Sequence, residues 1–423
     1  MKPHSFPGQV ARADHTPPVR SIEPELILDL TRLLSRVRHP TPTGVDRVEL
    51  HYARALLARA PERLQFAATH PLGHYGRLDP GAVLRFLDAT ERRWGEVGGE
   101  ETGGAGMRHL LVALASLRPQ RIEPTTRPRI VLHVSPSALE KPGKIAARLR
   151  RENARLICLV HDLIPIAEPG FARADGSLRH QRRMIGVARH AHGVIANSQA
   201  TADALARHLD AIAEPVPPLL VNPLGTAPLA SDAPGPPPID GPYFLCLGTI
   251  EPRKNHLLLL HLWRRLAEAA DGSRIPRLVL IGRRGWENQN TFNLLDRCPQ
   301  LRPHVLEVGR VSDRTLSAWL GGSSALLMPS FAEGFGLPVA EALAAGIPVI
   351  ASDLPAHREA GGAVPDYLDP LDGPGWHRSI LDYAAPASSA RSAQLARMRG
   401  SSRRTWEDHV ERTLAFAEEV ARS

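Results

Sequence analysis

The chain of 423 residues is predicted to form two α/β domains, each built on a parallel β-sheet. Short apolar runs alternate with helical stretches along most of the sequence, which is typical of parallel strands joined by helices. A proline-rich segment, Ala227–Pro238, interrupts this alternation, which starts again after it. At this length each half can bury a hydrophobic core of its own. The sequence therefore indicates a two-domain α/β protein.

The first predicted domain occupies residues 23–225 and follows a polar, proline-containing tail, 1–22, that we expect to be disordered. Its strands and helices are identified from apolar runs and from amphipathic stretches. Strands are expected at Glu25–Asp29, Leu64–Ala68, Ile130–Val134, Leu156–Val160 and Gly193–Asn197, and helices at Asp46–Arg59, Ile145–Arg151 and Leu178–Ala191.

The second predicted domain, 241–402, follows a proline-rich linker at 226–240. Strands are expected at Tyr243–Leu247, Leu278–Ile281, Val305–Val308, Ala325–Met328 and Pro348–Ala351. Gly248, Gly282 and Gly309 directly follow three of these strands. Ligands of open α/β sheets bind at the carboxyl ends of the strands, so these turns indicate a ligand-binding edge. Residues 403–423 are predicted to form an amphipathic C-terminal helix.

The composition favours a cytoplasmic protein. No apolar run approaches the roughly 18 to 20 residues that span a bilayer, and the first residues lack the apolar core of a signal peptide. The isolated cysteines Cys158, Cys246 and Cys298 form neither a disulfide framework nor a zinc pattern. The net charge of +8 suggests an anionic partner. The basic clusters at 141–151 and 179–183 fit an ordinary solvated surface or contact with an anionic membrane, and we find no nucleic-acid-binding motif.

The most informative stretch, 330–348, contains two carboxylates, Glu333 and Glu341, on either side of a glycine-rich loop. Gly334 and Gly336 give this loop backbone freedom after a buried strand, and a helix follows. The N-terminus of that helix favours an anion. Carboxylates on both sides of a phosphate site match hydroxyl groups that flank the phosphate, and this combination describes a sugar nucleotide.

Further candidates lie at other strand ends. Arg253 and Lys254 follow the strand that ends at Gly248, where two cations can neutralise a diphosphate, although such a pair is often ordinary surface charge. His161 follows a buried strand and can bind a sugar hydroxyl, although a lone loop histidine is often structural. Ser198 is expected to cap the following helix rather than to contact a ligand.

Metal ligands are missing from the sequence. There is no Asp-x-Asp pair, and no cluster of histidine and cysteine has metal-ligand spacing. His70 and His74 are four residues apart, but the proline and glycine between them exclude the helix that such a metal pair requires. We therefore expect no metal or other cofactor, and stabilisation of phosphate by cations and a helix terminus.

Together these segments resemble the retaining glycosyltransferases of family 4 (glycosyl transferases group 1), which have the GT-B architecture. The resemblance extends from about residue 26 to 406 and is most specific over 243–362, where Glu333-Gly-Phe-Gly-Leu-Pro338 and Glu341 match the family's Glu-x7-Glu element. It implies two Rossmann-like domains that face a central cleft, with a C-terminal helix, 403–423, that crosses back to the first domain. The first domain, 23–225, is implied to be on the acceptor side, and the second, 241–402, to bind the nucleotide sugar.

The resemblance also implies individual roles. Glu333 contacts the donor sugar, and Glu341 binds the ribose hydroxyls of the nucleotide. Arg253 and Lys254 bind the diphosphate, and His161 lies beside the donor sugar, so that these three residues and Glu333 form the catalytic set. Further donor contacts are implied for Gly44, Arg310, Val311, Gly334, Phe335, Gly336 and Leu337.

One position departs from the family. Many relatives carry an arginine directly after the strand glycine, where this chain has Thr249, and Arg253 is expected to replace it. The resemblance implies a metal-independent, retaining transfer of a hexose, with mannose favoured, from a nucleotide-diphosphate sugar to a glycan or lipid-linked glycan. The expected context is polysaccharide or lipopolysaccharide biosynthesis, in the cytoplasm or at the inner face of the plasma membrane.

Two alternatives remain open at this point. A sugar-nucleotide epimerase or a phosphorylase can share the architecture, and the second would require phosphate or pyridoxal phosphate. A non-catalytic partner that binds a sugar nucleotide within a larger assembly is the other alternative. The donor base, the sugar, the acceptor and the oligomeric state do not follow from the sequence.

Overall fold

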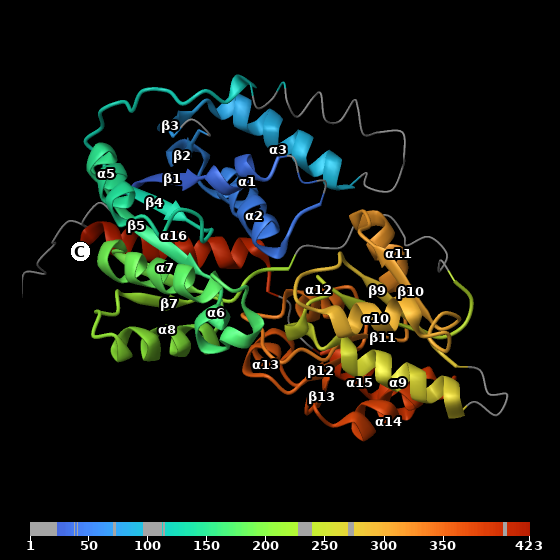
Figure 1. The fold of residues 1–423 in the computed structure, drawn as a ribbon. Coiled ribbons are helices and arrows are strands. Elements are labelled where there is room, and N and C mark those ends of the chain that lie inside the picture. Colours follow the sequence, from blue (N-terminus) through green and yellow to red (C-terminus); the bar gives the residue numbers. More distant parts are fainter. Residues whose placement is uncertain are drawn as a thin grey trace, which may run out of the picture.

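A computed structural model describes residues 23–37, 39, 41–70, 73–95, 112, 115–226, 239–269, 275–400 and 404–423. The predicted tail, 1–22, and most of the predicted linker, 227–238, lie outside the described residues. Two sheets, each covered by helices, form the two halves of the molecule, as Figure 1 shows. The predicted two-domain α/β fold is confirmed.

Within the described residues, the first sheet has seven strands in the order β3-β2-β1-β4-β5-β6-β7. All neighbours pair in parallel except β2 and β3, which are antiparallel. The strands are β1 (Glu25–Asp29), β2 (Leu64–Thr69), β3 (Tyr75–Leu78), β4 (Arg129–His133), β5 (Ala154–Val160), β6 (Gly193–Ala196) and β7 (Leu219–Val221). The helices are α1 (Thr31–Ser35), α2 (Gly44–Arg59), α3 (Pro80–Gly95), α5 (Pro142–Glu152), α6 (Ile164–Ala167), α7 (Gly176–His190) and α8 (Gln199–Ala211), with short 3-10 turns η1 (Pro61–Arg63) and η2 (Pro169–Phe171).

The second sheet is parallel throughout and has the order β10-β9-β8-β11-β12-β13 among the residues described. Its strands are β8 (Tyr243–Leu247), β9 (Arg277–Ile281), β10 (Val305–Gly309), β11 (Ala325–Met328), β12 (Val349–Ser352) and β13 (Asp366–Leu368). The helices are α9 (His256–Ala269), α10 (Gln289–Arg297), α11 (Asp313–Gly321), α12 (Leu337–Ala344), α13 (Pro355–Gly361), α14 (Gly373–Ala384), α15 (Ser389–Arg399) and α16 (Trp406–Arg422), with the 3-10 turn η3 (Pro252–Lys254).

Three strands were not predicted: β3, β7 and β13. Each has only three or four residues, and β3 contains both a glycine and Arg77. The guanidinium of Arg77 is buried against the carboxylate of Glu152, at 2.9 Å, so a charged residue occupies a buried position on the edge strand β3. Such a strand has no apolar run that sequence analysis can recognise.

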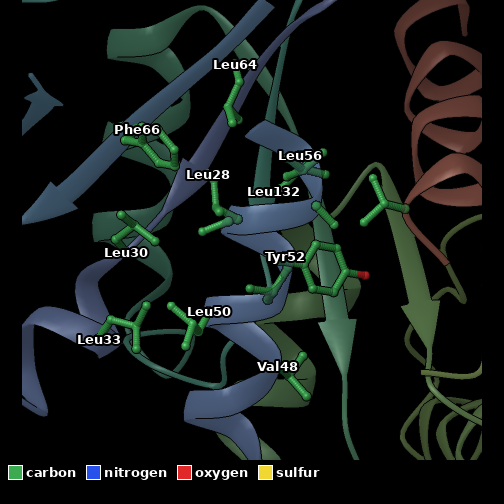
Figure 2. Close-up of a cluster of buried hydrophobic side chains, with 14 of the residues drawn as sticks. Leu28, Leu30, Leu33, Val48, Leu50, Tyr52, Leu56, Leu64, Phe66 and Leu132 are labelled. Atoms are coloured by element: carbon green, nitrogen blue, oxygen red, sulfur yellow. The ribbon is translucent and has the colours of Figure 1, made fainter. Parts of the chain in front are cut away.

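The first domain has a hydrophobic cluster on each face of its sheet, and one of them lies between the sheet and α2. Leu28 and Leu132 from the sheet face Leu56 and Tyr52 from α2, and all four are buried (Figure 2). Burying a leucine fully contributes roughly 1.5–3 kcal/mol, so this apolar face fixes α2 and, with it, the loop that precedes the helix. In Figure 2 the hydroxyl of Tyr52 points away from the leucines, and it lies 2.5 Å from Nε2 of His409 on α16.

Helix α16 belongs by packing to the first domain, although it follows the second in sequence. Figure 1 shows it, in red, among the blue and green elements of the first sheet. Trp406 stacks on His51, with ring centroids 4.9 Å apart, and a Cβ built on Gly193 would lie 2.9 Å from Phe416. The C-terminal helix thus packs on the first domain, as expected. The chain therefore returns from the second domain to the first. No described helix is long and hydrophobic enough to cross a membrane.

Candidate active site

The loop between β11 and α12 approaches the first domain closely. Gly334 has no room for a side chain, because a Cβ built there would lie 2.2 Å from the carbonyl oxygen of His161. The carbonyl oxygen of Gly334 accepts hydrogen bonds from the hydroxyls of Ser198, at 2.7 Å, and Thr201, at 3.2 Å. Ser198 also caps α8, as predicted, by accepting from the N–H of Thr201. The loop is therefore bound to the first domain, with the two domains in contact.

Helix α12 begins beside this loop. Gly336 is its N-terminal cap residue and has φ of +94°, a left-handed conformation that glycine adopts without strain. Phe335, in contrast, has a buried side chain that packs in the core cluster of the first domain, together with Leu224. Its expected role near the donor can therefore involve only its backbone, because its side chain is occupied in packing.

Glu333 lies at the centre of an ion cluster. Its carboxylate is 2.6 Å from Nζ of Lys254 and 2.8 Å from a guanidinium nitrogen of Arg253, and it accepts from the hydroxyl of Ser330 at 2.8 Å. The Glu333 side chain is 9% exposed. Burial opposes ionisation, but the charges of Arg253 and Lys254 outweigh it and hold the pKa of this carboxyl well below its usual range. Glu333 is a carboxylate at neutral pH.

The donors of Arg253 are used within the protein. Its Nε and one terminal nitrogen donate to Glu251, at 3.1 and 2.7 Å, and the other terminal nitrogen donates to the carbonyl of Ala332 at 2.5 Å. With Glu333 also in contact, Arg253 has two carboxylate partners. This geometry fits a residue that holds the loop better than one that is free to bind a diphosphate. Direct contact of Arg253 with the donor stays a prediction.

His161 lies across the loop from this cluster, at the end of β5. Its Nε2 is 2.8 Å from the carbonyl oxygen of Val134, and since a carbonyl can only accept, Nε2 carries the hydrogen. Burial lowers the pKa of His161 below its usual value, which favours the neutral ring. In that form Nδ1 is an acceptor, suited to receive the proton of a sugar hydroxyl.

A cavity of about 270 Å³ opens between the two domains at the carboxyl ends of β8, β9 and β10. It brings together five of the residues that sequence analysis proposed as donor contacts: Gly44, Arg310, Val311, Leu337 and Glu341. Lys254 adjoins the cavity, because its Cε lies 3.3 Å from a Cβ built on Gly248, which lines the wall. We call this space the cleft cavity. Arg253, Glu333, His161, Gly334, Phe335 and Gly336 do not line it.

Glu341 faces the cleft cavity from the second turn of α12. Burial, reinforced by the charge of Asp313 and opposed by that of Arg47, raises the pKa of Glu341 to about 7. Arg47 and Asp313 form an ion pair between the domains, with one guanidinium nitrogen 3.0 Å from a carboxylate oxygen. Glu341 thus changes charge close to neutral pH, beside a contact that joins the two domains.

Three arginines of the cleft cavity were not predicted as ligands: Arg36, Arg47 and Arg283. Arg283 follows Gly282 at the end of β9, so its position beside a strand glycine was a signal that could have identified it. Thr249, in the position where many relatives carry an arginine, also lines the cavity. Arg283 therefore places a cation after β9, which pairs with β8, the strand that precedes Thr249. No cluster of three or more histidine, cysteine, aspartate or glutamate side chains suited to a metal is found among the described residues.

Sequence comparison assigns a family to part of the chain. Residues 229–362, which contain the cation pair and both glutamates, match the family described as glycosyl transferases group 1. The similarity to glycosyl transferases group 1 found in the sequence is thereby confirmed for this region, whereas membership of family 4 stays a prediction. The matched region contains the residues of the second domain that line the cleft cavity, and also the ion cluster around Glu333.

Curated relatives extend the similarity beyond residues 229–362. The O-antigen chain mannosyltransferase B of Escherichia coli is 31% identical over 172 residues, 41% of this chain and 44% of the relative. The serotype-specific mannosyltransferase WbdA of Escherichia coli is 25% identical over 360 residues, 79% of this chain and 38% of the relative. The alignments thus span less than half the length of either relative.

Solved structures show the same fold over almost the whole chain. Sucrose-phosphate synthase from Thermosynechococcus elongatus superposes with a TM-score of 0.59 at 16% identity, covering 94% of this chain and 99% of its own. Anabaena HepE, solved in complex with UDP-glucose, gives a TM-score of 0.55 at 15% identity, covering 92% of this chain and 99% of its own. The chain has the GT-B fold, as predicted.

Proposed function

We propose that the chain is a retaining glycosyltransferase. It moves a hexose, with mannose favoured, from a nucleotide-diphosphate sugar to a glycan or lipid-linked glycan during polysaccharide or lipopolysaccharide synthesis. The observation on which this proposal rests is the cleft cavity, which is lined by Glu341 and several arginines of both domains and adjoins Lys254, the ion-pair partner of Glu333. The names of the curated mannosyltransferases and the UDP-glucose bound to HepE support it.

The donor is bound across the cleft cavity. Glu341 accepts hydrogen bonds from the two ribose hydroxyls, and the base packs at Arg310 and Val311. Arg47 and Arg283 supply cations for the diphosphate, as arginine does in many phosphate sites. The start of α12 and Lys254 adjoin the same space and add positive charge beyond the second phosphate.

The chemical step breaks the bond between the anomeric carbon and the diphosphate oxygen. Negative charge grows on the departing diphosphate, and preformed cations and N–H groups lower the barrier by stabilising that charge. The proton of the attacking hydroxyl passes to a departing phosphate oxygen on the same face, which gives retention without a protein nucleophile. Glu333, with its lowered pKa, is a weak base and serves to position the sugar. His161 binds a hydroxyl through Nδ1.

The proposed reaction is metal-independent, because the cations that line the cleft cavity supply the positive charge that the diphosphate needs. Closure of the domains excludes water that would otherwise hydrolyse the donor. A cytoplasmic location and contact with an anionic membrane surface stay predictions.

The proposal is tested by supplying a panel of nucleotide sugars, including GDP-mannose, with and without α-linked mannotriose as acceptor. We expect one donor to be consumed mainly when acceptor is present, and proton NMR of the first product to show the same anomeric configuration as the donor. Inversion of the anomer would contradict retention. Conversion of the donor without acceptor into another nucleotide sugar would favour an epimerase, and no binding of any donor would overturn the proposal.

Donor affinity is expected to rise with pH through Glu341. Because its pKa is raised to about 7, this carboxyl is mostly protonated at pH 6 and mostly ionised at pH 8. Only the carboxylate accepts from both ribose hydroxyls, so the Kd for the nucleotide sugar should fall about tenfold over this range, as one ionisation allows. Isothermal titration calorimetry checks this, and Glu341→Gln should bind weakly and without the pH dependence.

A nucleotide sugar is the right probe, because both of its phosphates are esterified and neither titrates near neutral pH. A free nucleoside diphosphate would add its own ionisation with a pKa of about 6. A tenfold change that persists in Glu341→Gln would assign the pH dependence to another group.

A further inference from the structure

A second cavity, of about 390 Å³, lies in the first domain and is not part of the proposed donor site. It is formed where α5 and the residues at the start of β3 meet the ends of β1, β2 and β4. Thr31 follows β1, Thr69 ends β2 and His133 ends β4, and all three line the cavity. The cavity therefore lies at the carboxyl edge of the first sheet, the edge at which ligands of open α/β sheets bind.

The charged side chains of this cavity are basic. Among the described residues its lining contains no aspartate or glutamate, but it contains two lysines and two arginines: Lys141, Lys144, Arg148 and Arg151. We call this space the basic cavity. Lys141 and Lys144 are exposed, and their ammonium groups have no ion-pair partner in the part of the chain that the structure describes. Positive charge is therefore available there to an anionic ligand.

Carboxylates close to the basic cavity are already paired with arginines. Asp29 is 2% exposed and pairs with Arg148, and Glu152 is fully buried and pairs with Arg77 at 2.9 Å. Glu140, in the loop before α5, pairs with two arginines of α7 at 2.8 and 3.3 Å. Of the four cations that line the basic cavity, these pairs neutralise only Arg148.

Helix α5 presents its N-terminal end to the basic cavity. Lys141 is the N-cap residue and makes no side-chain cap, and the first turn contains no acidic residue. The positive end of the helix dipole therefore adds to the charges of Lys141 and Lys144. Backbone N–H groups at such a helix end bind phosphate oxygens, and lysine binds phosphate as a point charge. This combination is typical of a phosphate site, whereas an uncharged ligand would leave the two lysines without a partner.

The basic cavity adjoins the proposed reaction centre through the end of β4. His133 lines the cavity, and the carbonyl of the next residue, Val134, accepts the hydrogen bond from Nε2 of His161 at 2.8 Å. A molecule held in the basic cavity would therefore reach His161 from the first domain. In the proposed function, Glu341 and Arg310 hold the nucleotide from the second domain, so the two ligands would meet between the domains.

We propose that the basic cavity binds a phosphate group carried by the glycan acceptor, such as a phosphodiester that links a glycan to a lipid. The inference rests on the proposed function, because it needs a transfer reaction beside His161. It adds a property of the acceptor: a glycan that carries phosphate is preferred to the same glycan without it. The headgroup of a membrane phospholipid has the same chemistry, so the test includes it as a second source of phosphate.

The test compares two acceptors that differ only at the reducing end of α-linked mannotriose, an octyl phosphodiester and a neutral octyl glycoside. We expect the wild-type KM to be about tenfold lower for the phosphodiester, since a hydrogen bond to a charged group contributes at least that much. Lys144→Ala should remove this preference, and Lys144→Arg should keep it. Arg150→Ala is the matched control, because Arg150 is exposed on the same helix but does not line the basic cavity. All three variants should keep the wild-type kcat with the neutral acceptor.

Calorimetry with the phosphodiester and no donor separates this inference from the proposed function. If only the proposed function fails, no donor is consumed, yet the phosphodiester still binds the wild type and binds Lys144→Ala far more weakly. Equal affinity of the wild type for the two acceptors would overturn the inference, as would a preference that both Lys141→Ala and Lys144→Ala retain.

Flotation with vesicles that contain phosphatidylglycerol examines the second source of phosphate. We expect Lys144→Ala to bind these vesicles as the wild type does. Loss of vesicle binding in Lys144→Ala, together with equal use of the two acceptors by the wild type, would assign the basic cavity to a membrane phospholipid and overturn its role in acceptor binding.

Discussion

Replacement of Glu333 by glutamine is expected to lower kcat by about 100-fold or more, because catalytic alignment is lost when a positioning group moves by about 1 Å. In the present structure Glu333 neutralises Lys254 and shares Arg253 with Glu251. Without its charge, Lys254 has no carboxylate at 2.6 Å and the loop from Phe331 to Gly334 loses its fixed position. Steady-state kinetics with saturating donor measures the effect on kcat.

The same variant should also lose stability. Removing one partner from a buried ion pair costs about 3–5 kcal/mol, since the other charge is left without compensation. The pKa of Glu333 is lowered on folding, so its contribution is complete above the ordinary value of 4.5 and is lost as pH falls below it. Thermal unfolding at pH 7 measures the loss. Glu268→Gln, at an exposed position of α9, is the control for stability.

A Glu333→Gln variant with wild-type kcat would contradict the positioning role.

The edge at which the cleft cavity lies could be predicted from the sequence, because the strand ends of a parallel sheet share one edge. Arg310 and Glu341 come from distant segments of the second domain, yet one follows a predicted strand and the other lies in the helix after one, and both line the cleft cavity. For these two residues the order of the strands determines proximity, whereas Gly44, from the first domain, reaches the same cavity only through the packing of the two domains. Their contacts with a donor stay predictions, as does the catalytic role of His161.

Contacts between the domains could not be predicted in this way. Arg47 and Asp313 are 266 residues apart and meet only because of the angle at which the two sheets face each other. The close approach of Gly334 to the first domain is part of the same interface and has no periodic signal in the sequence. The amphipathic pattern of α16 predicts a helix but not the surface on which it packs. The partners of Arg253 could not be predicted either. Its donors are used by Glu251, Ala332 and Glu333, and a sequence motif identifies a residue without its partners.

Gly334→Ala is the second variant for which we expect a large effect, with kcat reduced about 100-fold and the Kd for the nucleotide sugar changed far less. The added Cβ would lie 2.2 Å from the carbonyl oxygen of His161 and 2.9 Å from Cβ of Asp162. Gly334 does not have a positive φ, so alanine fits its backbone and only the contact between domains is affected.

The domains must then move apart, which withdraws His161 from the donor sugar and admits water. The ratio of donor hydrolysis to transfer, together with small-angle scattering of the protein with bound donor, measures this opening. Gly143→Ala is the matched control, because a Cβ at Gly143 meets nothing within 4 Å. Unchanged scattering together with a wild-type transfer rate would show that the close approach of Gly334 to the first domain is not required for catalysis. A reduced kcat with a wild-type hydrolysis ratio would instead assign the effect to local misplacement of Glu333.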